Sequence, residues 1–176
     1  MTTTASRGRE LLRAVFSPRT APLPADIALI AARIALAWVF VYHGSRRLFG
    51  WFDGPGIDAS AKYFADVAHL HPGTLFAVTG GAIEFFGGIA IALGLLSRVA
   101  GCAIFVDMMM AIVTVTWANG INATGGKSGY ELNLALGVLA LVIGMFGAGR
   151  FSVDALIARR LRQRNQAPVT TEAPAQ

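Results

Sequence analysis

Three ionisable side chains lie inside apolar segments of this sequence, where they could do chemistry. Arg33, Glu84 and Asp107 each interrupt a run of apolar residues, and His43 and Glu131 lie near the ends of two such runs. A charged group within a lipid bilayer costs a few kcal/mol, so it faces a helix bundle or a wet cavity and usually finds a partner there. These residues are therefore candidates for a functional site, with permanent structural pairing as the alternative.

Helical depth predicts which of these groups meet. At a rise of about 1.5 Å per residue, Arg33 and Asp107 lie about 10 Å and about 13 Å from the same face of the bundle, and such a pair can be bidentate. By the same rise, Glu84 and His43 lie at about 20 Å and about 24 Å, where they could hydrogen-bond. The sequence therefore predicts a lower Arg33–Asp107 pair and an upper polar cluster. That cluster comprises His43, Arg46, Arg47, Glu84 and Glu131.

Glu84 is the residue best placed for function. Gly80 and Gly87 lie four residues before it and three residues after it, on the same helix face, and such glycines let a neighbouring helix approach closely. Burial disfavours a charged carboxylate, whereas a cationic His43 or Arg47 nearby favours it. Such opposing effects favour proton exchange, which suits quinone or proton-coupled chemistry. A permanently paired structural acid is the alternative.

Asp107 lies on a face of the third apolar segment that also carries Met110, Thr114 and Trp117. Methionine and aromatic residues are common core fillers. The face is therefore expected either to line a site or to be a packing surface with a satisfied acid.

Long apolar segments must position these residues. The chain has 176 residues, of which 55% are hydrophobic and 14% charged, whereas soluble domains carry about 25% charged residues. Each segment approaches the roughly 20 residues that a helix needs to cross a bilayer. Only Ser97 and Arg98 separate the second from the third, so these two should form an antiparallel hairpin. The sequence predicts an all-α integral membrane protein, a four-transmembrane-helix bundle, with spans at about 27–45, 74–96, 99–118 and 130–148.

The distribution of basic residues predicts the orientation of this bundle. The side that holds both termini carries ten: Arg7, Arg9, Arg13, Arg19, Arg98, Arg150, Arg159, Arg160, Arg162 and Arg164. The other side carries four: Arg46, Arg47, Lys62 and Lys127. Basic residues favour the cytoplasmic side. We therefore expect a multi-pass protein of the bacterial plasma (inner) membrane with both termini in the cytoplasm.

The segments outside the spans divide the chain. Residues 1–25 form a basic leader with a short amphipathic turn, residues 26–158 the membrane domain, and residues 159–176 a basic, partly disordered tail. The loop at 46–73 contains an expected interfacial helix at 58–70, and the Gly/Asn/Ser-rich loop at 119–128 should be mobile. Ser152 is a plausible N-cap for a basic helix that would lie on anionic lipid.

Several chemistries are excluded or disfavoured by composition. A single cysteine, Cys102, permits neither an intramolecular disulfide nor a CxxC motif. The three histidines are too scattered for a convincing haem or metal site, so no metal is expected. The net charge of +5 comes mostly from arginines at the chain ends, which suits lipid headgroups. No nucleic-acid-binding motif is present, and no nucleic acid partner is expected.

The ordered motifs of the chain resemble the DoxX family of small membrane proteins over about residues 26–158. They are Arg33 with Phe40; His43-Gly44 followed by Arg46, Arg47 and Leu48; Glu84 with Gly87 and Gly88; Gly94-Leu95; Arg98; Gly129-Tyr130-Glu131; and the segment from Gly147 to Asp154. The resemblance implies a four-helix membrane bundle. Arg47 stands where many members have lysine, which keeps the charge but changes its geometry.

The resemblance also implies a link to redox chemistry. The family takes its name from a terminal quinol oxidase complex, and some members look like membrane partners of soluble oxidative-stress and sulfur-transfer enzymes. The leading hypothesis is therefore a membrane subunit or anchor of a redox complex, with a quinone as the candidate cofactor and soluble redox or sulfur-transfer enzymes as candidate partners. The alternatives are a small proton-coupled transporter that uses Glu84, and a purely structural anchor; whether the protein is an enzyme stays open.

Overall fold

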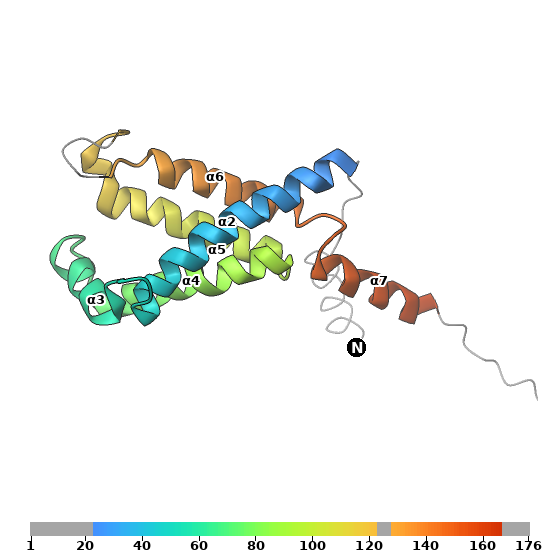
Figure 1. Cartoon of the computed structure of the whole chain (residues 1–176), viewed down its shortest axis with the longest axis horizontal. Coiled ribbons are helices and arrows are strands. Elements are labelled where there is room, and N and C mark those ends of the chain that lie inside the picture. Colours follow the sequence, from blue (N-terminus) through green and yellow to red (C-terminus); the bar gives the residue numbers. More distant parts are fainter. Residues whose placement is uncertain (1–22, 123–127, 167–176) are drawn as a thin grey trace, which may run out of the picture.

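The computed structural model describes residues 23–122 and 128–166, and every regular element within these ranges is a helix. Figure 1 shows a bundle with a short helix, α3, at one end and a projecting helix, α7, at the other. The helices are α2 (Leu23–Phe49), α3 (Gly56–Asp66), α4 (Gly73–Leu93), α5 (Ser97–Ala111), α6 (Glu131–Phe146) and α7 (Val153–Gln166). A π-turn (Ile112–Thr116) and a 3₁₀ turn (Trp117–Asn119) extend α5.

Three of the described helical segments are long and apolar enough to cross a membrane. They are Leu23–Phe49, Gly73–Leu93 and Ser97–Asn119. The predicted fourth span corresponds to α6, an apolar helix of 16 residues. At about 1.5 Å per residue, α6 is roughly 24 Å long, which is shorter than the roughly 30 Å core of a bilayer. The helical prediction is confirmed at all four places, whereas the fourth crossing stays a prediction.

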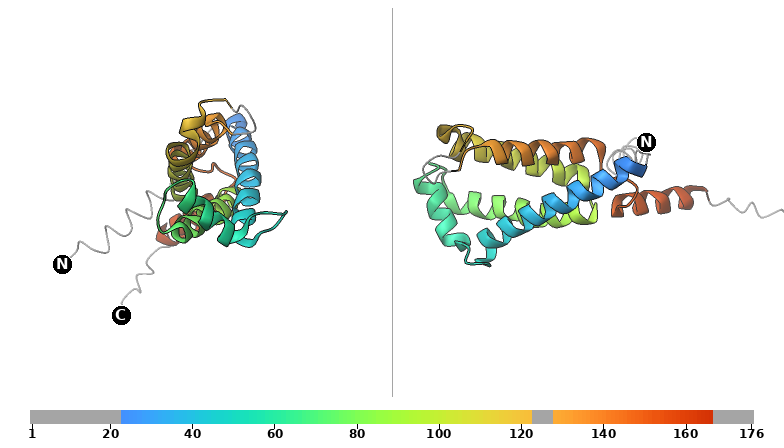
Figure 2. Two further views of the ribbon diagram at one scale, coloured as in Figure 1. Left: turned by 90° about the vertical axis from the view of Figure 1, so that its left-hand side faces the viewer. Right: turned by 45° about the horizontal axis from the view of Figure 1, so that its top comes forward.

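The helices form two closely packed pairs, α2 with α4 and α5 with α6, and α4 also contacts α5. Both Figure 1 and the right-hand view of Figure 2 show α2 crossing the bundle obliquely. Leu36, Ile91, Ile104 and Ile143 have no exposed surface and fill the centre. The outer surface is apolar, with Trp38 79% exposed and Val113 72% exposed, as expected for side chains that face lipid.

The turn between α4 and α5 differs from the predicted one. Ser97 begins α5, so the connection is Gly94–Leu96 and not Ser97-Arg98. Gly94 adopts a left-handed conformation, and its N–H and that of Leu95 donate to carbonyls of the last turn of α4, which is a Schellman motif. The N–H groups of Leu96 and Ser97 donate to the Asp154 carboxylate. This distant cap lets α5 begin two residues earlier than expected.

The connecting segments follow the sequence predictions in part. The helix expected at 58–70 is α3, which begins at Gly56, ends at Asp66 and packs against α4. Ser152 caps α7 as predicted, because its hydroxyl accepts a hydrogen bond from the Ala155 N–H at 3.2 Å. Helix α7 crosses the predicted boundary at residues 158 and 159 and points away from the bundle (Figure 1). The amphipathic turn of the leader, the last residues of the tail and residues 123–127 lie outside the described residues.

Candidate functional site

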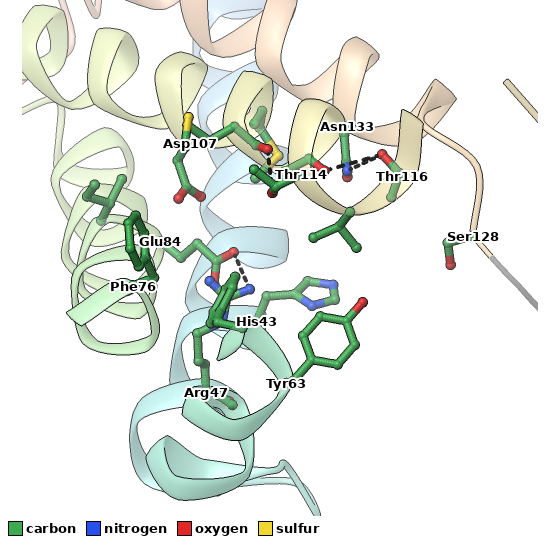
Figure 3. Close-up of a pocket in the computed structure, with 18 of the residues that line it drawn as sticks. His43, Arg47, Tyr63, Phe76, Glu84, Asp107, Thr114, Thr116, Ser128 and Asn133 are labelled. Carbon is green, nitrogen blue, oxygen red and sulfur yellow. Dashed lines mark hydrogen bonds and ion pairs between the residues drawn. The ribbon is translucent and has the colours of Figure 1, made fainter. Parts of the chain in front are cut away.

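A cavity of about 1050 Å³ lies among the helices at the α3 end of the bundle (Figure 3). Residues of α2, α3, α4, α5 and α6 contribute to its wall. Most of the wall is apolar, as Val39, Phe40, Phe64, Phe76, Ile83 and Leu136 illustrate. Ligand cavities in proteins typically enclose about 300–1,000 Å³ and combine apolar walls with a few polar groups. The volume is therefore large enough for a molecule of cofactor size.

Glu84 and Arg47 form an ion pair in the wall of this cavity. Arg47 Nη2 lies 3.3 Å from Glu84 Oε1, and the carboxylate side chain is only 5% exposed. The other carboxylate oxygen, Oε2, is buried and has no hydrogen-bond partner within the described part of the chain. A buried polar atom without a partner costs about 1–3 kcal/mol, so its presence here needs an explanation.

Asp107 belongs to the same group of charges. A methyl group built on Gly80 would lie 2.9 Å from Arg47 Nη1 and 3.4 Å from Asp107 Oδ1. The guanidinium and the second carboxylate therefore approach each other over the bare backbone of Gly80. Figure 3 shows Asp107 on α5 facing the Glu84 side of the cavity on α4. The absence of a side chain at Gly80 makes room for this arrangement.

Close packing of α2 on α4 holds Arg47 beside Glu84. A methyl group on Gly44 would collide with the Phe85 backbone, and one on Gly88 would lie 3.0 Å from the Val41 nitrogen. On the other side of α4, a methyl group on Gly87 would lie 3.2 Å from the Ile104 side chain of α5. The expectation that glycines of the second span allow close approach of neighbouring helices is therefore confirmed.

The opposite wall of the cavity carries uncharged polar groups. Thr116 is buried, and its hydroxyl accepts a 3.5 Å hydrogen bond from Asn133 Nδ2. Thr114, Thr116 and Asn133 all line the cavity in Figure 3. Sequence analysis missed Asn133, although an amide within an apolar segment is itself a signal. The wall thus offers neutral hydrogen-bonding groups across from the charged ones.

The predicted face of the third segment is only partly correct. Asp107, Met110 and Thr114 line the cavity, whereas Trp117 stacks on Tyr130 with ring centroids 5.6 Å apart. The π-turn at Ile112–Thr116 contains Thr114 and ends directly before Trp117. A π-turn accommodates one extra residue, which rotates the side chains that follow relative to a regular helix. The fixed helical spacing used for the prediction does not apply beyond it.

The predicted upper cluster is brought together in part. His43, Arg47 and Glu84 line the cavity, and Arg47 rather than His43 contacts Glu84. Arg46 and Glu131 are not among the lining residues. Arg46 follows the helix about 100° away from its neighbour and donates a 2.8 Å hydrogen bond to the Tyr42 hydroxyl. Glu131 is exposed in the first turn of α6, where a carboxylate is favoured by the helix dipole.

The predicted Arg33–Asp107 pair is wrong. Arg33 is buried at the opposite end of the bundle, and within the described ranges its guanidinium donates hydrogen bonds to backbone carbonyls. The acceptors are Ile91 O at 2.9 Å, Ala92 O at 2.7 Å, Ala148 O at 2.9 Å and Phe151 O at 2.9 Å. The final carbonyls of a helix lack intrahelical donors and attract cations, and the long arginine side chain reaches the end of α4. The prediction assumed that residues at equal depth on straight parallel helices meet, and this assumption does not hold for Arg33 and Asp107.

Two further carboxylates near Arg33, Asp26 and Asp154, join segments at this end of the bundle. Arg150 forms an ion pair with Asp26, whose carboxylate also accepts a 3.0 Å hydrogen bond from the Arg150 N–H. Asp154 accepts a 2.6 Å hydrogen bond from the Ser97 hydroxyl. These contacts join the starts and ends of the helices and lie away from the cavity residues. We call the set formed by Arg33, the Arg150–Asp26 ion pair and the Ser97–Asp154 hydrogen bond the Arg33 clasp.

Comparison with known proteins agrees with the motifs of the sequence. The DoxX family profile matches residues 28–117, which span the first three apolar helices. The uncharacterized membrane protein Rv3486 of Mycobacterium tuberculosis is 28% identical over 161 residues, which cover 81% of this chain and 89% of that protein. No solved structure matches the chain. The protein is thus a member of the DoxX family of membrane proteins.

Proposed function

We propose that this protein is the membrane subunit of a redox system and binds a quinone in the cavity beside Glu84. One observation carries the proposal: Glu84, in the wall of a largely apolar cavity, has a buried carboxylate oxygen that finds no hydrogen-bond partner in the described part of the chain. A group of this kind is stabilised when a ligand supplies the missing hydrogen bond. An apolar ring that bears carbonyl or hydroxyl oxygens matches such a cavity in both its polar and its apolar parts.

The proposed redox role rests on family membership as well as on the cavity. The DoxX resemblance associates such proteins with quinol oxidation and with soluble redox or sulfur-transfer enzymes. We propose enzymes of this kind as partners, with the membrane protein providing the quinone site. This arrangement places the chemistry of electron transfer in the partner and the binding of the lipophilic molecule in the helix bundle.

The proposed orientation has four crossings and both ends in the cytoplasm of a bacterial cell. The distribution of basic residues, ten against four, supports it. The bundle supports four crossings because α6 packs along α5 as a fourth apolar helix. In this orientation, the Arg33 clasp faces the cytoplasm and the Glu84 cavity lies toward the outer side of the membrane.

A proton-coupled transporter is the second candidate. The observation that favours it is the presence of two carboxylates, Glu84 and Asp107, at one intramembrane cavity. Buried acids of this kind mark proton relays in pumps and transporters. A transporter would move its substrate across proteoliposomes in response to a pH gradient, whereas the quinone site predicts binding without transport.

The direct test is quinone binding to the purified protein in lipid nanodiscs that contain no quinone. A para-naphthoquinone should bind to the wild-type protein, and Glu84→Leu should weaken binding at least about tenfold because it removes the polar contact, worth about 1.4 kcal/mol. Glu131→Gln, which changes an exposed acid outside the cavity wall, is the matched control and should bind normally. Equal binding by wild type and Glu84→Leu would overturn the proposed site.

A further inference from the structure

The charged groups of the cavity do not balance. Arg47 supplies one positive charge, whereas Glu84 and Asp107 supply two negative charges when both are ionised. One guanidinium thus lies near two carboxylates and pairs with one of them, and one negative charge remains in surroundings that are largely apolar. An unbalanced charge in such a place is costly, and a proton is the simplest group that neutralises it.

The other groups around Glu84 do not supply a second permanent cation. Helix α2 presents Arg47 and the exposed His43, and α3 presents Tyr63. Helix α5 presents Asp107, and the residues of α6 in the cavity wall, Leu132, Asn133 and Leu136, are uncharged. Among the described residues that line the cavity, His43 is therefore the one remaining group that can gain a positive charge. Figure 3 shows it on the same side as Tyr63.

The oxygen without a partner shows where such a proton would act. Glu84 Oε1 faces Arg47, whereas Oε2 is buried and has no hydrogen-bond partner among the described residues. An ionised carboxylate only accepts hydrogen bonds, but a protonated one also donates through its O–H. A quinone carbonyl only accepts, so it can bind at Oε2 when that oxygen carries the proton.

We propose that Glu84 and Asp107 share one proton and that Glu84 Oε2 uses it to donate a hydrogen bond to a neutral carbonyl oxygen of the ligand. Asp107 is then a positioning residue, because its nearby negative charge disfavours a second negative charge at Glu84 and so favours the proton there. No bond to carbon forms or breaks, and ligand binding fixes one proton at the site. This inference rests on the proposed function, since it requires a neutral ligand in the cavity.

The test is the pH dependence of para-naphthoquinone binding to wild-type protein in nanodiscs. Affinity should be constant at acid pH and then fall about tenfold per pH unit once the shared proton is lost. Adding the quinone to lightly buffered protein just above this point should cause proton uptake from the solution. A flat affinity profile without proton uptake, with binding intact, would overturn the shared proton and leave the proposed function standing.

If the proton is shared, two isosteric variants should change the pH dependence of quinone binding in different ways. Glu84→Gln carries a permanent amide donor, so it should bind the quinone with an affinity that no longer depends on pH. Asp107→Asn removes the second negative charge, so Arg47 keeps Glu84 ionised and the pH profile should shift about one unit or more toward acid. Glu131→Gln should match the wild type.

The outcomes separate the two proposals. Wild-type behaviour of Asp107→Asn, or an unchanged pH dependence in Glu84→Gln, would overturn the shared proton while quinone binding persists. Absence of quinone binding to the wild type at every pH would overturn the proposed function and this inference together. The expected combination is pH-independent binding by Glu84→Gln with an acid-shifted profile for Asp107→Asn.

Discussion

Arg47 of α2 forms an ion pair with Glu84 of α4, with 3.3 Å between Nη2 and Oε1, and the second oxygen of that carboxylate has no hydrogen-bond partner among the described residues. The pair joins the first two long apolar helices next to a cavity of about 1050 Å³. Its two partners have different roles in our account. Arg47 holds the carboxylate in place, whereas the free oxygen is the part that meets a ligand.

Replacing Arg47 should destabilise the protein more than replacing the adjacent Arg46. Arg47→Leu leaves a buried carboxylate without its cation, and breaking a buried pair costs about 3–5 kcal/mol. The loss should be smaller than this range because the arginine side chain is 26% exposed and Glu84 can take up a proton. Arg46→Gln should cost less than about 1 kcal/mol. Denaturant unfolding in detergent micelles measures both; equal losses would argue against the pair.

The Arg33 clasp should contribute to stability independently of the cavity. Arg33→Leu removes the donors of four backbone carbonyls, so we expect a loss of several kcal/mol, at about 1 kcal/mol for each hydrogen bond. Asp107→Leu acts at the other end of the bundle. The double variant should lose the sum of the two single losses within about 0.5 kcal/mol. A double variant milder than Arg33→Leu alone would restore the predicted Arg33–Asp107 pair.

The prediction of that pair failed for a reason of geometry. Apolar length and intramembrane charge are local properties, so the helices and the cavity positions of His43, Arg47 and Glu84 could be predicted from the sequence. Depth arguments treat helices as parallel and side chains as short. The oblique path of α2 (Figure 2) and the long reach of Arg33 violate both assumptions.

Other errors arose from interactions between residues distant in sequence. Ser97 begins α5 because Asp154, near the start of α7, caps it. A cap from a residue so distant in sequence cannot be predicted from the local sequence pattern. Trp117 leaves the face of Asp107 because a π-turn precedes it. The sequence around this turn is an ordinary apolar run, so its spacing gives no sign that the helix changes register there.

The glycines of α2 and α4 should differ in their tolerance of alanine. Gly44→Ala places a methyl group against the Phe85 backbone, which cannot move without separating the helices. We expect a loss of about 1–3 kcal/mol, typical of overpacking, together with weaker quinone binding. Gly87→Ala meets the flexible end of Ile104 at 3.2 Å and should be milder. Thermal unfolding in detergent compares the two, and equal losses would show that α2 can shift away at no cost.

The proposed orientation predicts the location of two reporter fusions. A reporter inserted after Ser60 should lie outside the cytoplasm, and one fused after Thr170 should lie inside it, because basic residues are concentrated on the terminal side. Paired phosphatase and fluorescent-protein fusions measure this in living cells. A Thr170 fusion on the outer side would contradict the orientation, and two fusions on the same side would contradict four crossings.

The most direct measurement of the central claim is photolabelling with an azido-naphthoquinone, followed by mass spectrometry of the labelled peptides. The account predicts labels on cavity residues such as Phe76, Ile83 and Leu136, and their loss in Glu84→Leu but not in Glu131→Gln. Excess unlabelled quinone should compete for these positions. Labels confined to lipid-facing side chains such as Trp38 and Val113, unchanged in Glu84→Leu, would contradict the account.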